Sequence, residues 1–143
     1  MCQNYNLTCT DDANAQPAFE VRMKTIASDQ GAPARWEFRL LPVGADPMVT
    51  EPYELKVEEV DAEYARIDLI TNNGNIAYMR KNLAEALLPD VAQRVQRRIQ
   101  SSPSLGKGAV SRNENANVMW KRLAGKGLAT YLPLPLDIYQ LNT

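Results

Sequence analysis

The chemistry available to this chain is limited first by the absence of histidine. None of the 143 residues is His, which excludes Ser-His-Asp and Cys-His catalysis, histidine-ligated zinc and an imidazole pH switch. Carboxylates, Lys, Tyr, Cys or a bound cofactor would have to carry any reaction. The acidic run of Glu58, Glu59, Asp61 and Glu63 lacks the spacing of a calcium-binding loop. The sequence therefore predicts no metal site.

The most specific pattern lies near the C-terminus. Its positions are Asn113, Ala116, Trp120, Leu123, Gly125 and Gly127. Ala116, Trp120 and Leu123 recur at helical spacing, and glycine commonly follows the last residue of a helix. The pattern predicts an amphipathic helix entered at Asn113 and followed by a strand.

This pattern resembles the last quarter of the GNAT superfamily of N-acetyltransferases. In that family an Asn and an Ala begin a helix, an aromatic residue follows four positions after the Ala, and a glycine turn leads into a final hairpin. The resemblance covers roughly residues 53–141. It implies an acyl-CoA cofactor and the transfer of an acyl group to an amine.

The resemblance also implies roles for individual residues. The cofactor's pantetheine would pair with the backbone from Leu69 to Thr71, and its pyrophosphate would lie at the loop from Asn72 to Asn75. Asp68 would be the general base, and Trp120 stands where the family has the tyrosine that protonates the departing thiolate. The cofactor-binding residues implied are Leu69, Thr71, Asn73, Gly74, Asn75 and Asn113.

Charge is unevenly distributed along the chain. Residues 1–79 hold 6 Lys/Arg and 13 Asp/Glu, whereas residues 80–126 hold 10 Lys/Arg and 3 Asp/Glu. The basic segment would attract an anionic ligand, a nucleic acid or an acidic protein surface. Alternatively, the two halves neutralise each other within the fold or across a dimer. The candidate anion-binding residues are Arg94, Arg97, Arg98, Arg112, Lys121 and Arg122.

The C-terminal segment also fits a second function, that of a non-enzymatic interaction protein of the kind a phage or mobile element encodes. A basic helix, a glycine turn and a hairpin are the parts of a winged helix, with Arg112, Lys121 and Arg122 toward a DNA groove. The apolar, proline-rich hairpin tip from Leu132 to Leu136 would instead favour contact with a protein.

Hydrophobic periodicity predicts the elements that position these residues. Period-two alternation predicts strands over residues 19–25, 35–40, 53–58 and 64–71. Helical spacing predicts a helix from Ile76 to Leu88, restarted after Pro89 as a second helix up to Gln100, before the helix at Asn113. Two strands, 128–132 and 136–141, end the chain.

These elements predict a single α+β domain over residues 18–143, preceded by a polar leader over residues 1–17. Its fold would be a four-stranded antiparallel meander, then two or three helices packed on it and a C-terminal hairpin. Cys2 and Cys9 would be free thiols or would close a small disulfide in an oxidising compartment. The absence of an apolar run of membrane-spanning length predicts no membrane contact and a cytoplasmic location.

Overall fold

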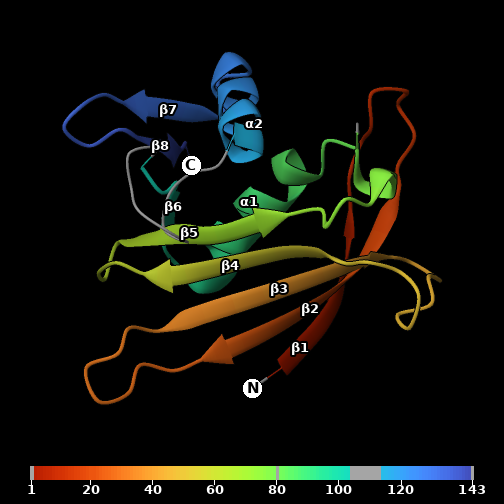
Figure 1. The fold of residues 1–143 in the computed structure, drawn as a ribbon, viewed down its shortest axis with the longest axis horizontal. Helices are drawn as coiled ribbons and strands as arrows, with labels where there is room; N and C mark the ends of the chain where they lie inside the picture. Colours follow the sequence, from red (N-terminus) through yellow and green to blue (C-terminus); the bar gives the residue numbers. More distant parts are fainter. Residues whose placement is uncertain (1, 80, 104–113, 143) are drawn as a thin grey trace.

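The structure, a computed structural model, describes residues 2–79, 81–103 and 114–142. Over these ranges the chain forms one eight-stranded sheet in the order β1-β2-β3-β4-β5-β6-β8-β7 (Figure 1). The strands are β1 Cys2–Thr8, β2 Ala18–Ile26, β3 Arg35–Pro42, β4 Tyr53–Glu59, β5 Tyr64–Thr71, β6 Arg98–Gln100, β7 Ala129–Leu132 and β8 Ile138–Leu141. The helices are α1 Leu83–Val95 and α2 Glu114–Gly125, with a 3-10 turn, η1 Ile76–Tyr78, before α1.

Strands β2 to β5 follow the predicted alternation and pair antiparallel in chain order. Phe38 of β3 lies opposite Leu55 of β4, and both are buried on the face that carries the helices. Glu37 and Lys56 lie opposite each other on the other face. One face of this part of the sheet is therefore apolar and the other charged.

The predicted fold class is wrong because these four strands are not a separate meander. They are the middle of a mixed sheet whose β5 and β6 run parallel. The first residues of the predicted leader form β1 along β2. Tyr5 and Leu7 of β1 are only partly buried, so the alternation that marks a strand is weak there. The C-terminal hairpin of β7 and β8 is confirmed, but β8 also pairs with β6.

The two helices predicted for the middle segment are also wrong, because one helix, α1, and the strand β6 stand in their place. Instead of a helix from Ile76 to Leu88, a 3-10 turn precedes α1, which starts at Leu83 and runs through Pro89. Gln96, in the left-handed conformation (φ 55°), ends α1, and the chain returns as β6. Ile99 is fully buried in β6, and an apolar residue at this spacing fits a helix or a strand equally well.

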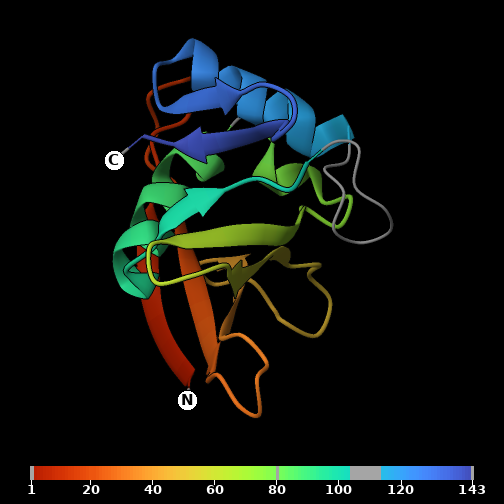
Figure 2. The same ribbon diagram turned by 90° about the vertical axis from the view of Figure 1, so that its left-hand side faces the viewer.

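Helices α1 and α2 cover different parts of the sheet (Figure 2). Helix α1 contacts β1 and β6. Helix α2 contacts β7, and its Trp120 stacks on Tyr139 of β8, with ring centroids 5.9 Å apart. The apolar core is continuous beneath both helices.

Both cysteines are free thiols. Cys2 begins β1 and Cys9 follows its last residue, Thr8. Seven residues of extended chain span roughly 23 Å, whereas a disulfide needs Cα atoms within about 7 Å. The strand therefore excludes the small disulfide loop. Of the described helices, neither has the length and apolar character needed to cross a membrane.

Leu87 tests the core beneath α1, because its side chain is fully buried. We expect Leu87→Ala to lower the free energy of unfolding by about 2–5 kcal/mol, through lost apolar burial and the cavity left behind. Urea titration followed by circular dichroism measures this change. Met48→Ala is the control, since Met48 is 87% exposed. Equal midpoints for the two variants would contradict the position of α1.

Candidate functional site

The candidate site lies where β5 and β6 separate. Their parallel pairing runs only from Tyr64 opposite Arg98 to Arg66 opposite Gln100. The Ser102 hydroxyl then donates to the carbonyl oxygen of Ile67 at 2.6 Å. Beyond this bond, no residue of the described ranges continues β6 along β5.

Strand β5 carries a β-bulge at the same place. Lys56 lies opposite Leu69 and Val57 opposite Ile67, so Asp68 is the extra residue. A bulge bends its strand and increases the local twist. The end of β5 is thereby turned relative to the short β6.

Past the bulge, the open edge of β5 presents backbone hydrogen-bonding groups. The Glu59 amide donates to the Ala34 carbonyl, on the β3 side. Backbone N–H and C=O groups of successive strand residues point to opposite neighbours, so those of Lys56, three residues earlier, point toward β5. Lys56 lies opposite Leu69. The N–H and C=O of Ile70, the next residue, therefore point away from β4, toward the space that β6 leaves.

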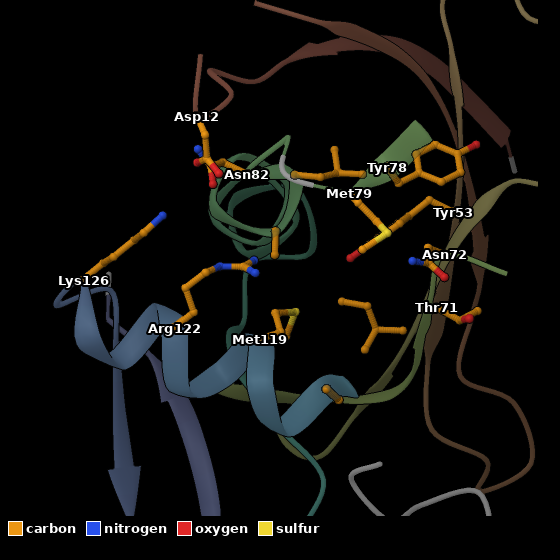
Figure 3. A pocket seen from close by; sticks show the side chains of 14 residues that line it. Asp12, Tyr53, Thr71, Asn72, Tyr78, Met79, Asn82, Met119, Arg122 and Lys126 are labelled. Atoms are coloured by element: carbon orange, nitrogen blue, oxygen red, sulfur yellow. The ribbon is translucent and has the colours of Figure 1, made fainter. Parts of the chain in front are cut away.

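A cavity of about 640 Å³ occupies this divergence (Figure 3). Its walls come from the end of β5, the start of β4, the segment up to the first turn of α1, and one side of α2. The lining residues are Asp12, Tyr53, Ile70, Thr71, Asn72, Tyr78, Met79, Asn82, Leu83, Ala84, Ala116, Met119, Arg122 and Lys126.

The first turn of α1 opens onto the cavity without a side-chain cap. Asn82, the N-cap residue, is in the left-handed conformation (φ 52°) and makes no capping hydrogen bond. Its amide group donates instead to Thr10 at 2.8 Å. Leu83 and Ala84 line the cavity. The amides of this turn, which have no acceptor within the helix, are suited to bind an anion.

Two basic side chains of α2 line the opposite wall. Arg122 and Lys126 both donate to Glu85 of α1, at 2.9 and 2.7 Å. Burial by itself would raise the pKa of Glu85, but these two hydrogen bonds and positive charges outweigh it and hold the pKa below its ordinary value. The cluster has one carboxylate for two cations, and the carboxylate of Asp12 also lines the cavity, so the charges of these four side chains balance.

Two tyrosines meet at the apolar end of the cavity. Their rings form an edge contact with centroids 5.7 Å apart. The Tyr78 hydroxyl lies 3.0 Å from the carbonyl oxygen of Leu40 and 2.8 Å from that of Glu51. The Tyr53 hydroxyl points into the cavity (Figure 3), and no hydrogen bond joins it to a described residue. Burial raises the pKa of Tyr53 well above its ordinary value, although Arg122 opposes the shift.

The two residues predicted as catalytic lie away from the cavity. Asp68 accepts a hydrogen bond from Arg66 at 2.9 Å on the charged face of the sheet, as does Glu58 at 3.0 Å. Trp120 is only 1% exposed and packs in the core. Neither side chain lines the cavity.

The structure separates the predicted cofactor-binding residues. Leu69 lies opposite Lys56 on the charged face, whereas Thr71 lines the cavity. In the loop, the Asn73 amide donates to Thr71 Oγ1 at 3.0 Å. The Gly74 amide donates to Asn72 Oδ1 at 2.9 Å, and the Asn75 amide to the Asn72 carbonyl at 3.0 Å. These amides stabilise the turn itself and are not directed at a phosphate. Asn113 lies outside the described residues.

Most of the predicted anion-binding residues already have acidic partners. Arg94 pairs with Asp90 at 3.0 Å, Arg97 with Glu59, and Arg98 with Glu63 at 3.8 Å; Arg122 pairs with Glu85, as above. Lys121 is exposed on α2. Arg112 lies outside the described residues. The described arginines of this set therefore do not form an unpaired cationic surface.

Sequence reasoning missed the residues that the cavity brings together. Tyr53 has the alternation of an ordinary buried strand residue, and Asn82 lacks the glycine that usually signals a phosphate-binding turn. The signal that was present is the left-handed tendency of Asn directly before the apolar residues Leu83 and Ala84.

Glu85 is expected to make stability depend on pH. Its carboxylate stabilises the fold above the ordinary pKa of 4.5, and this contribution is lost as the pH falls through the lower pKa of the folded state. We expect Glu85→Gln to lower the urea midpoint at neutral pH, and the difference from wild type to shrink in acid. Glu51→Gln, an exposed carboxylate, is the control. A difference independent of pH would contradict the ion-pair assignment.

Comparisons with protein-family models, curated proteins and solved structures found no match to this chain. The geometry of the cavity is therefore the basis on which a function is inferred.

Proposed function

We propose that the chain binds an acyl-CoA in the cavity between β5 and α2 and transfers the acyl group to an amine, as its resemblance to the GNAT superfamily implies. The observation that carries the proposal is the parallel pairing of β5 with β6 over three residues, followed by a cavity at their divergence. A V-shaped opening between parallel strands is what the resemblance implies at the cofactor site.

The open edge of β5 suits the pantetheine arm. This arm is an extended chain with two amide groups, which pair with a strand edge much as another strand would. Ile70 supplies an N–H and a C=O on that edge, and its side chain lines the cavity. The pairing implied near Leu69 to Thr71 thus centres on the backbone of Ile70.

The pyrophosphate fits the first turn of α1 better than the loop from Asn72 to Asn75. The loop amides donate within the loop, whereas the first turn of α1 has no side-chain cap and borders the cavity. Arg122 and Lys126 stand across from it. Helix amides and basic side chains together favour a polyanion.

The proposal assigns no ligand contact to Asp68 or Trp120. The amine nitrogen would attack the thioester carbonyl carbon, forming the C–N bond as the C–S bond breaks and the CoA thiolate leaves. Positioning the thioester in the cavity contributes by bringing the reacting atoms together.

A second candidate function, contact with another protein, is favoured by the hairpin tip. Leu134 and Leu136 are 67% and 56% exposed, and neither lines the cavity. A protein contact there would be separate from cofactor binding.

CoA binding tests the proposed function directly. We expect CoA to raise the Tm of the protein with a concentration dependence that saturates, because a ligand specific for the folded state stabilises it. Arg122→Gln should weaken CoA binding by roughly tenfold through loss of a charge-assisted contact, as measured by isothermal titration calorimetry.

Lys121→Gln is the matched control, because Lys121 lies beside Arg122 on α2 but does not line the cavity. It should leave CoA affinity unchanged, as should Leu134→Ser at the hairpin tip. Absence of CoA binding at millimolar concentration would refute the proposed function. Equal losses in the Arg122 and Lys121 variants would place the ligand elsewhere.

A further inference from the structure

The Tyr53 hydroxyl is a polar group of the cavity that neither the fold nor the proposed function uses. Its residue is only 8% exposed, and its hydroxyl points into the cavity (Figure 3). Buried polar groups nearly always have hydrogen-bond partners. The Tyr53 hydroxyl faces the cavity and has no hydrogen-bond partner among the described residues, so it is available to a ligand that enters the cavity.

We propose that Tyr53 donates a hydrogen bond to the carbonyl oxygen of the bound acyl thioester and so recognises the acyl group as distinct from the rest of CoA. This inference rests on the proposed function. It assigns a role to a residue of β4 that the resemblance does not single out.

The surroundings of Tyr53 hold the phenol in place. Its ring lies edge-on against Tyr78, with centroids 5.7 Å apart, and Tyr78 in turn packs against Phe19 at 5.9 Å. Tyr78 is fixed through its hydroxyl at the carbonyls of Leu40 and Glu51. A donor held rigidly before the ligand arrives loses little freedom on binding.

The chemistry of the cavity favours a carbonyl as the partner of Tyr53. The side chains of Ile70, Met79 and Met119 on the same walls do not offer strong hydrogen-bonding groups to a ligand. Arg122 lines the cavity as well, but its guanidinium has donors only and cannot accept a hydrogen bond from the phenol. The pantetheine arm on the edge of Ile70 would carry its thioester to this apolar end.

The hydroxyl acts as a donor and keeps its proton throughout. Because burial raises the pKa of Tyr53, the phenol stays neutral at physiological pH and its O–H remains available. During attack by the amine, the carbonyl oxygen gains the electron pair of the C=O π bond, and the O–H stabilises that negative charge. The pair returns as the C–S bond breaks; the attacking nitrogen loses one proton to solvent, and the thiolate takes one proton from solvent.

The test uses the difference between acetyl-CoA and CoA, because free CoA lacks the carbonyl. Both affinities are measured by isothermal titration calorimetry for the wild type, Tyr53→Phe and Tyr78→Phe. We expect Tyr53→Phe to weaken acetyl-CoA binding about threefold to tenfold, the range of one neutral hydrogen bond, and to leave CoA affinity unchanged. Its Tm without ligand should equal that of the wild type.

Tyr78→Phe is the matched control. It also removes one phenolic oxygen, but that oxygen lies at backbone carbonyls. The ring that contacts Tyr53 remains, so we expect a lower Tm and an unchanged ratio of the two affinities. An unchanged ratio in Tyr53→Phe would overturn the role of Tyr53 while the proposed function stands. A fall in the Tm of Tyr53→Phe as large as that of Tyr78→Phe would overturn it too. Failure of the wild type to bind either compound would refute both.

Discussion

The short parallel pairing of β5 with β6 determines the rest of this architecture. Parallel strands need a crossover connection, which here is α1, a 13-residue helix about 20 Å long. It returns the chain to the start of β5, where the Arg98 amide donates to the Glu63 carbonyl. Directly after β6, the Ser101 amide donates to the Tyr139 carbonyl on β8. This change of partner leaves the last residues of β5 without a neighbouring strand among the described residues on that edge.

The uneven charge along the chain is partly compensated by ion pairs among the described residues. Glu59 and Glu63, at the β4–β5 turn, pair with Arg97 and Arg98 at the end of the crossover. Arg97 also donates to the last carbonyls of α1, where a cation complements the helix dipole. These ion pairs join the acidic and basic halves of the chain within the fold, as one of the two alternatives that the sequence left open predicts. The charge pattern therefore reflects contacts within the fold, between the β4–β5 turn and the end of the crossover.

The sequence predicted those elements whose burial is regular. In β3, Trp36, Phe38 and Leu40 alternate with charged residues and are buried, and β2, β4 and β5 are similar. Strand β6 spans three residues with one buried side chain, too few for a period to be recognised. The open edge of β5 results from the pairing of segments that are distant in the sequence. The local hydrophobic pattern of β5 therefore could not predict it.

The start of α1 shows the same limit in the candidate site. Asn75 fits the pattern of an N-cap, and its side chain does accept the Ala77 amide at 2.9 Å, but only for a 3-10 turn. Helix α1 begins after Asn82, and Asn82 itself is in the left-handed conformation. The sequence indicates this conformation only weakly. This displacement moves the first helical turn away from the predicted phosphate loop and onto the cavity wall.

The cavity persists because the two helices cover different ends of the same apolar face. Helix α1 packs on β1 and β6, α2 on β7, and Glu85 joins them through Arg122 and Lys126. The ion pairs span the gap with polar atoms, so no apolar side chain is required to fill it. Arg122 and Lys126 share this one carboxylate, and both also line the cavity. The contact that holds the helices together thus also places two basic side chains at the cavity, across from the first turn of α1, which has no side-chain cap.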